Sequence, residues 1–134
     1  LQDRAVRLIS GVKRDHEMPI LYEKHGLLPF HKIYVYSVQC FAYKFHHDTL
    51  PEIFRKFFIR NSDVHQINTK SKSLLHVPIC RSESRSISVS FSGVRCYNHL
   101  YNQLPLNTVL YQYKMNLKIY LRTNDLKNIL DSPK

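Results

Sequence analysis

The apolar stretch over residues 33–45 constrains the fold of this chain more than any other feature. Hydrophobic side chains surround the stretch almost completely, with few polar positions between them. A β-strand in a globular protein usually has about five or six residues, so this stretch is long for a strand. We therefore expect residues 33–45 to form a buried helix.

Segments on both sides of this stretch repeat their apolar residues at helical spacing. Residues 1–11 form one such segment, with Gly11 placed to end it, and a short helix is expected over residues 19–26. Thr49 and Glu52 have capping-box spacing, in which the threonine accepts a backbone hydrogen bond and the glutamate reaches back. We expect this box to start a helix whose apolar stripe consists of Ile53, Phe54, Phe57 and Phe58.

The spacing of apolar residues changes to every second position in two later segments. Residues 86–91 alternate serine with an apolar residue, which is typical of a half-buried strand. Residues 75–79 alternate in the same way, although Pro78 would confine that strand to a sheet edge. The two strands are expected to pair as a hairpin across the polar residues 80–85.

Helical spacing returns after the predicted hairpin. One helix is expected over residues 94–104, and a last helix, capped by Asn107 or Thr108, is expected to extend to Leu121. The sequence thus predicts a mainly α fold with a small β-hairpin (α+β). This would be a compact domain of about five to six helices, with the hairpin before the last two.

The boundaries of the chain suggest one folded module and a tail. Residues 1–125 are expected to form a single helical module, and residues 126–134 a frayed C-terminal tail. Because Leu1 begins inside an amphipathic pattern, we also expect the chain to be a fragment of a longer protein.

The charge of the chain favours a polyanionic partner. Twenty lysines and arginines against ten acidic residues give a formal charge of +10, which favours nucleic acid over an anionic membrane surface. Residues 55–95 hold eight of these cations against Asp63 and Glu83, so a phosphate backbone is expected to bind there. No apolar run reaches the roughly 18 to 20 residues that span a bilayer.

The sequence shows no self-sufficient active site. Its aspartates are far apart, whereas a two-metal polymerase or nuclease needs clustered carboxylates, and its three glycines form no phosphate loop. His46 and His47 are adjacent, so their side chains diverge, and Cys40, Cys80 and Cys96 are too scattered for a disulfide scaffold or zinc site. We expect no catalytic residue, metal, cofactor or small-molecule site, and free cysteines in a nuclear or cytoplasmic protein.

Residues 68–73 form the segment most typical of nucleic-acid binding. Small polar side chains alternate there with Lys70 and Lys72 and could follow a phosphate backbone, although a solvated surface loop has the same composition. Aromatic side chains could also stack on bases, but those at helical spacing are expected in the core. That expectation covers Phe54, Phe57, Phe58, Tyr113 and Tyr120, and it is left open for Tyr97 and Tyr101.

Four blocks of sequence together resemble one protein family. They are residues 1–11, the Leu-Pro pairs at residues 28–29 and 50–51, residues 61–70, which are similar to an N-x-x-x-H-x-x-N-T-R pattern, and residues 86–98. In this order they resemble the region after the polymerase domain of non-LTR (LINE, jockey-like) retrotransposon reverse transcriptases. Tyr97 stands where that family usually has a tryptophan.

The resemblance implies a thumb-proximal, non-catalytic role. The paired catalytic aspartates of the family lie upstream and have no counterpart here, so Mg²⁺-dependent polymerisation would belong to the parent protein. The chain would bind template RNA or an RNA–DNA hybrid and contact the polymerase domain in cis. The residues expected to contact nucleic acid are Arg60, His65, Asn68, Thr69, Lys70, Lys72, Arg81 and Arg85.

Three other interpretations stay open. The apolar residues 33–45 also suit a docking module that touches no nucleic acid. A free-standing helix-turn-helix domain needs polar side chains toward the start of its recognition helix, and the last predicted helix offers Gln112, Asn116 and Lys118. A decayed genomic remnant would show the same sequence blocks.

Overall fold

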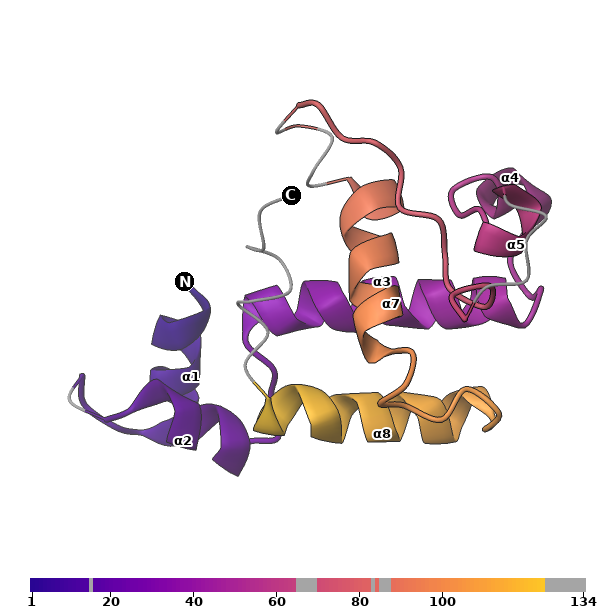
Figure 1. Ribbon diagram of the computed structural model, residues 1–134. Coiled ribbons are helices and arrows are strands. Elements are labelled where there is room, and N and C mark those ends of the chain that lie inside the picture. The colour runs from indigo at the N-terminus through magenta and orange to yellow at the C-terminus, as the bar shows by residue number, and fades with distance from the viewer. Residues whose placement is uncertain (15, 65–69, 83, 85–87, 125–134) are drawn as a thin grey trace.

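The structure, a computed structural model, describes residues 1–14, 16–64, 70–82, 84 and 88–124. Across these residues the chain is mainly helical, as predicted, with seven α-helices and one π-helix (Figure 1). The number exceeds the five to six expected because two of the α-helices have only four residues. None of the helices found in this part of the chain is long and apolar enough to cross a membrane.

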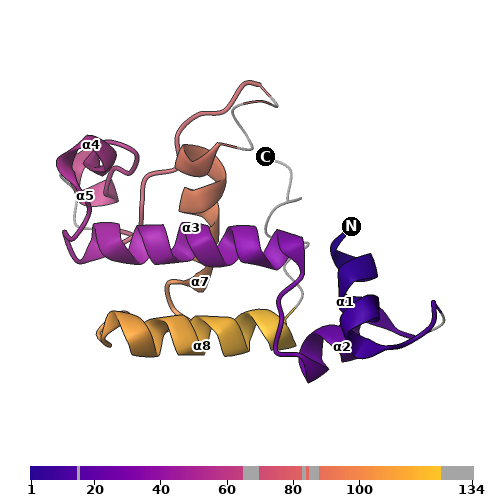
Figure 2. The same ribbon diagram turned by 180° about the vertical axis from the view of Figure 1, so that it is seen from behind.

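Helices α1 (Gln2–Ser10) and α2 (Met18–Lys24) pair at one end of the molecule (Figures 1 and 2). Gly11 and Gly26, predicted as helix ends, both have a positive φ, which glycine adopts without a steric penalty. Between the helices lies a small core to which α1 contributes Val6, while its Leu8 and Ile9 remain exposed.

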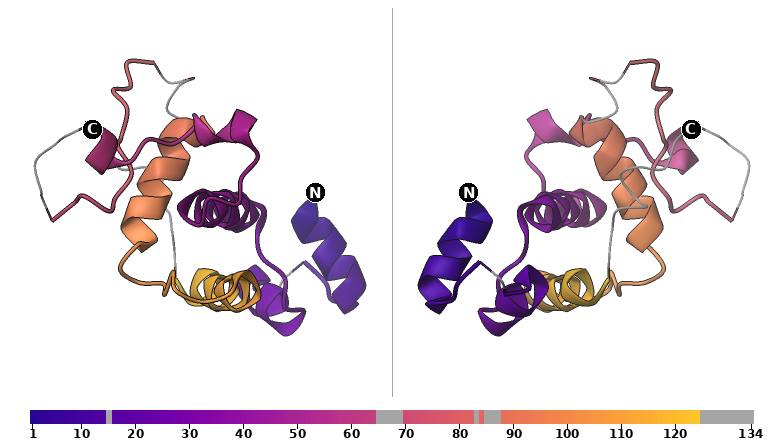
Figure 3. Two further views of the ribbon diagram at one scale, coloured as in Figure 1. Left: turned by 90° about the vertical axis from the view of Figure 1, so that its right-hand side faces the viewer. Right: turned by 90° about the vertical axis from the view of Figure 1, so that its left-hand side faces the viewer.

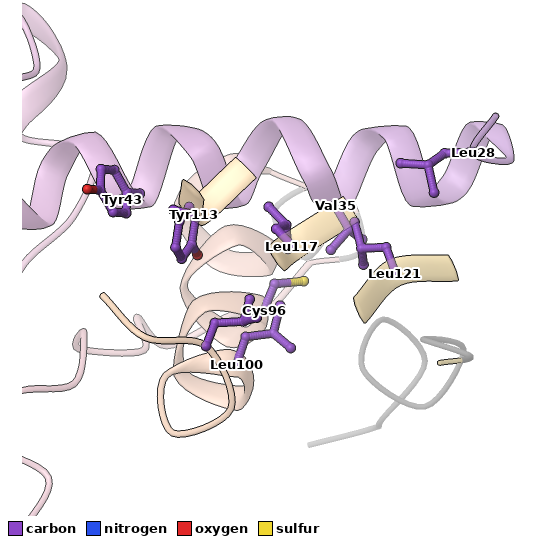
Figure 4. Packing of buried hydrophobic residues seen from close by; sticks show 9 residues of the cluster. Leu28, Val35, Tyr43, Cys96, Leu100, Tyr113, Leu117 and Leu121 are labelled. Carbon is purple, nitrogen blue, oxygen red and sulfur yellow. The ribbon is translucent and has the colours of Figure 1, made fainter. Parts of the chain in front are cut away.

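Helix α3 (Phe30–His46) confirms the helix predicted over residues 33–45 and extends it at its N-terminal end, but only one face of it is buried. It runs alongside α8 (Leu110–Thr123), and α7 (Val94–Leu100) crosses beside both (Figures 1 and 3). The three helices enclose the main core (Figure 4). Its buried side chains are Leu28, Val35, Tyr43, Cys96, Leu100, Leu104, Tyr113, Leu117 and Leu121.

The capping box predicted at Thr49 and Glu52 is wrong. The Thr49 hydroxyl donates to the Lys44 carbonyl, 3.1 Å away, and so it satisfies the C-terminal end of α3 instead. The helix that follows, α4 (Glu52–Arg55), has only one turn and no side-chain cap. The predicted cap of α8 is wrong for the same reason, since the Thr108 hydroxyl donates to the Pro105 carbonyl at 3.0 Å and Val109 precedes the helix.

The short length of α4 also changes which aromatic residues are in the core. Phe58 is buried, with 3% of its surface exposed, and it packs with Leu75 and Tyr97 in a second core cluster against α3 and α7. Phe54 and Phe57 are 40% and 43% exposed, so the prediction that they are core residues is wrong. Helix α4 ends at Arg55, before Phe57 and Phe58, so the residues of the predicted stripe do not lie on one helix face.

The predicted β-hairpin is not seen in the residues that the structure describes, and residues 83 and 85–87 of the predicted hairpin lie outside them. Leu75 forms an isolated antiparallel bridge with Arg60, and the rest of residues 75–79 form no strand. The second strand was expected over residues 86–91, and residues Val89–Gly93 form the π-helix η1, which leads directly into α7. The Ser92 amide and hydroxyl both donate to the Ser88 carbonyl at 2.9 Å, so the backbone and the side chain of Ser92 share one helical acceptor here.

Gly93 lies where η1 meets α7, and it allows a close approach to α3. A Cβ atom there would lie 2.8 Å from the Val38 Cγ1 atom, although the φ of −64° suits alanine. We expect Gly93→Ala to lower the free energy of unfolding by about 1–3 kcal/mol through overpacking, measured by urea denaturation. Helix propensity alone predicts the opposite sign, so a stabilised variant would contradict this packing.

Candidate nucleic-acid interface

The predicted basic loop is closed at its base by backbone hydrogen bonds. The Asn61 amide donates to the Leu74 carbonyl at 3.0 Å, and the His76 amide donates to the Ile59 carbonyl at 2.7 Å. These bonds flank the Arg60–Leu75 bridge and bring the two ends of the loop together. The loop therefore begins and ends at a single fixed point on the protein.

Asn98 of α7 attaches that point to the core. Its Oδ1 atom accepts from the Leu75 amide at 2.9 Å, and its Nδ2 atom donates to the Leu75 carbonyl at 2.8 Å. The side chain thus satisfies the backbone of Leu75 as a neighbouring strand would. Because the Leu75 side chain is also buried against Phe58, the loop base is held by both packing and hydrogen bonds.

Lys70 and Lys72 are exposed on this loop, as are Ser71 and Ser73. Helix α5 (Asn61–Val64) forms the first part of the loop, directly after the Arg60–Leu75 bridge. The Asn61 Nδ2 atom donates to the Ser71 carbonyl at 2.9 Å. This bond fixes the backbone between the two lysines. Within residues 70–73, the alternation of small polar residues with cations is therefore on the surface of the protein.

Arg60, another predicted site residue, is engaged within the protein. Its Nη2 atom donates to the His46 carbonyl at 3.3 Å and lies 3.7 Å from a carboxylate oxygen of Asp48. Its guanidinium also lies over the Phe45 ring, 5.4 Å from the ring centre. Arg60 therefore holds the start of the loop against the end of α3, and any contact with phosphate would compete with these interactions.

The remaining predicted site residues divide into two groups. Arg81 is exposed on the segment between the loop and η1. His65, Asn68, Thr69 and Arg85 lie outside the described residues. Of the eight predicted residues, the structure thus places Arg60, Lys70 and Lys72 on one loop and Arg81 after it.

A groove beside the loop was missed from the sequence. It has a volume of about 330 Å³ and is lined by Lys56, Phe57, Ile59, His76, Pro78 and Ser90. Lys56 is exposed, so the groove has a cation among its lining residues. The one signal in the sequence was the run Phe57-Phe58-Ile59, which is too continuous for a single helix face to bury.

Beneath Arg60, a pair of polar side chains joins α3 to α7. The Tyr97 hydroxyl lies 3.0 Å from the His46 Nδ1 atom. Burial is the main cause that lowers the pKa of His46, and electrostatic interactions with His47 and Arg60 lower it further. Burial likewise raises the pKa of Tyr97. Tyr97, which is 2% exposed, is therefore a core residue, whereas Tyr101 is only partly buried.

Two further findings concern metal ions and similar proteins. The part of the chain that the structure describes contains no group of three or more His, Cys, Asp or Glu side chains that could hold a metal ion. Comparison of the chain with protein-family models, curated proteins and solved structures gives no match.

Proposed function

We propose that this chain is the non-catalytic C-terminal region of an RNA-directed DNA polymerase from a non-LTR (LINE, jockey-like) retrotransposon, and that it binds template RNA or an RNA–DNA hybrid. The observation that carries the binding role is the exposure of Lys70 and Lys72 on a loop whose base is fixed by Asn98. The ordered sequence blocks support the parentage. The parent would be a nuclear or cytoplasmic enzyme that supplies the Mg²⁺-dependent chemistry from its upstream domain.

The fixed loop base supports this role physically. A flexible basic segment loses backbone entropy when it binds, at roughly 1–2 kcal/mol for each residue that becomes ordered. The hydrogen bonds at the loop base and the Asn61–Ser71 bond order part of the loop before any ligand arrives. More of the phosphate attraction of Lys70 and Lys72 then remains as net affinity.

Removing the two loop lysines tests the binding role. We expect Lys70→Ala plus Lys72→Ala to reduce the dependence of log affinity on log salt by about 1.8, since each phosphate contact contributes about 0.9 for a duplex. Fluorescence anisotropy with a labelled RNA–DNA hybrid at several salt concentrations would measure this.

The matched control is Lys13→Ala plus Lys24→Ala, which removes the same charge from exposed positions in the N-terminal part of the chain. That variant should keep the original salt dependence. Equal losses in the two double variants would mean that only net charge matters and that the loop is not the binding site.

The docking interpretation has its own observation in its favour. Tyr111, Met115 and Ile119 form an apolar stripe at helical spacing on the exposed face of α8, and Phe30 is exposed at the start of α3. This stripe would suit contact with the upstream polymerase domain in cis. If the chain only docks on the polymerase domain and binds no nucleic acid, the RNA–DNA hybrid should show no salt-dependent binding in the titration above. Because the exposed face is largely apolar, it gives little support to the helix-turn-helix interpretation.

A further inference from the structure

The groove beside the basic loop has one wall formed by the half-exposed ring of Phe57. Two other rings hold Phe57 in place from the protein side. Its ring centre lies 6.1 Å from that of Phe54 at an angle of 34°, and 6.3 Å from that of Phe41 at 77°. The ring is therefore supported by aromatic contacts and still presents surface to the groove.

The size and charge of the groove narrow the choice of occupant. Its volume of about 330 Å³ is at the lower end of the roughly 300–1,000 Å³ typical of ligand pockets, so it suits one flat ring system. Lys56, which lines the groove, is an exposed cation. A flat aromatic ligand with a negative charge at its edge would match the apolar wall and this cation together.

We infer that this groove receives one unstacked base of a single-stranded nucleic acid, with the base against Phe57 and an adjoining phosphate near Lys56. The inference rests on the proposed nucleic-acid binding and adds a preference to it. A base in a duplex must be unpaired and unstacked before it can enter, at a cost that a single strand largely avoids. The groove therefore binds single strands, whereas the loop lysines contact the backbone of either form.

Replacing Phe57 tests the groove separately from the loop. Stacking of a base on an aromatic side chain contributes enough that we expect Phe57→Leu to weaken binding of a short single-stranded RNA by about 5-fold or more. Binding of the corresponding RNA–DNA duplex should stay within about 2-fold, because the phosphate contacts are unchanged. Phe57→Tyr, which keeps the ring, should bind the single strand as the original chain does.

Two controls accompany this measurement. Phe30→Leu changes another exposed phenylalanine, the first residue of α3. This change should alter neither the single-strand affinity nor the duplex affinity. The same single strand made as DNA shows whether the groove also selects the sugar. Thermal unfolding monitored by circular dichroism confirms that each variant is folded, and because Phe57 is half-exposed the leucine variant should remain so.

A fluorescent reporter gives a second, direct measurement. The chain contains no tryptophan, so Phe57→Trp introduces a single one at the groove wall. We expect its fluorescence to be quenched on adding the single strand and to change little on adding the duplex. The tryptophan introduced by Phe30→Trp should respond to neither.

The outcomes separate this inference from the proposed function. If Phe57→Leu weakens single-strand and duplex binding equally, or leaves both unchanged while the loop lysines still matter, the groove does not receive a base and the loop proposal stands. If no nucleic acid binds with a salt-dependent affinity, the proposed function fails and the inference fails with it.

Discussion

Replacing Leu117 with alanine is expected to lower the free energy of unfolding by about 3–5 kcal/mol, more than any other single substitution proposed for this chain. Leu117 is fully buried in the main core, where Figure 4 shows its side chain beneath α3. The substitution removes apolar contacts and leaves a cavity that the packed helices fill only in part. Since natural domains are stable by only about 5–15 kcal/mol, much of the chain could unfold under mild conditions.

Urea denaturation followed by far-ultraviolet circular dichroism measures this loss. Met115→Ala is the matched control, because Met115 lies on the exposed face of the same helix. We expect that change to cost less than about 1 kcal/mol. Similar losses for both variants would show that α8 does not pack against α3 and α7 through the Leu117 face.

Replacing Asn98 with alanine is expected to have the second largest effect. Two hydrogen bonds to Leu75 are lost, and the amide and carbonyl of Leu75 are left partly buried without their partner. A hydrogen bond contributes about 1 kcal/mol net, and an unsatisfied buried group costs about 1–3 kcal/mol, so a total loss of about 2–4 kcal/mol follows. Chemical denaturation would give its size.

The same variant should also affect binding, because Asn98 holds the base of the loop that carries Lys70 and Lys72. At a temperature where Asn98→Ala remains folded, we expect weaker binding of the RNA–DNA hybrid. Adding Lys70→Ala and Lys72→Ala to that variant should then cost less affinity than in the original chain. Fully additive losses would indicate that Asn98 stabilises the fold without positioning the loop.

Much of the helical fold could be predicted from local patterns. The apolar run over residues 33–45 predicted α3 because it exceeds the length of a strand, and Gly11 and Gly26 predicted helix ends because they adopt positive φ readily. Each of these signals lies within a single segment of the sequence, so it can be interpreted without knowing the tertiary contacts of that segment.

The predictions that differ from the structure concern segments with more than one possible set of local contacts. Thr49 was expected to cap the next helix, but its hydroxyl reaches back to the Lys44 carbonyl at the end of the preceding one. The alternation of serine with apolar residues before Gly93 has the period of a strand. Close packing of Gly93 against Val38 instead favours the helical turn η1. Contacts with α3 therefore override the local pattern.

The candidate site was predictable only in part for a similar reason. Lys70 and Lys72 were identified from composition, since alternating cations and small polar residues need no tertiary contact to be recognised. The bond pair from Asn98 to Leu75 joins segments 23 residues apart, and the groove wall at Phe57 exists because α4 ends early. Arg60 has the residue type of a phosphate ligand, yet its partner His46 ends α3 and its partner Asp48 lies in the turn after it.

Affinity for an RNA–DNA hybrid, measured as a function of salt, tests the binding role most directly. The unmodified chain would be titrated between roughly 50 and 200 mM salt, and log affinity plotted against log salt concentration. If Lys70, Lys72 and the other exposed cations contact phosphates, the plot is linear, and its negative slope becomes shallower by about 1.8 in the loop double variant. An affinity that does not change with salt would contradict nucleic-acid binding by this loop.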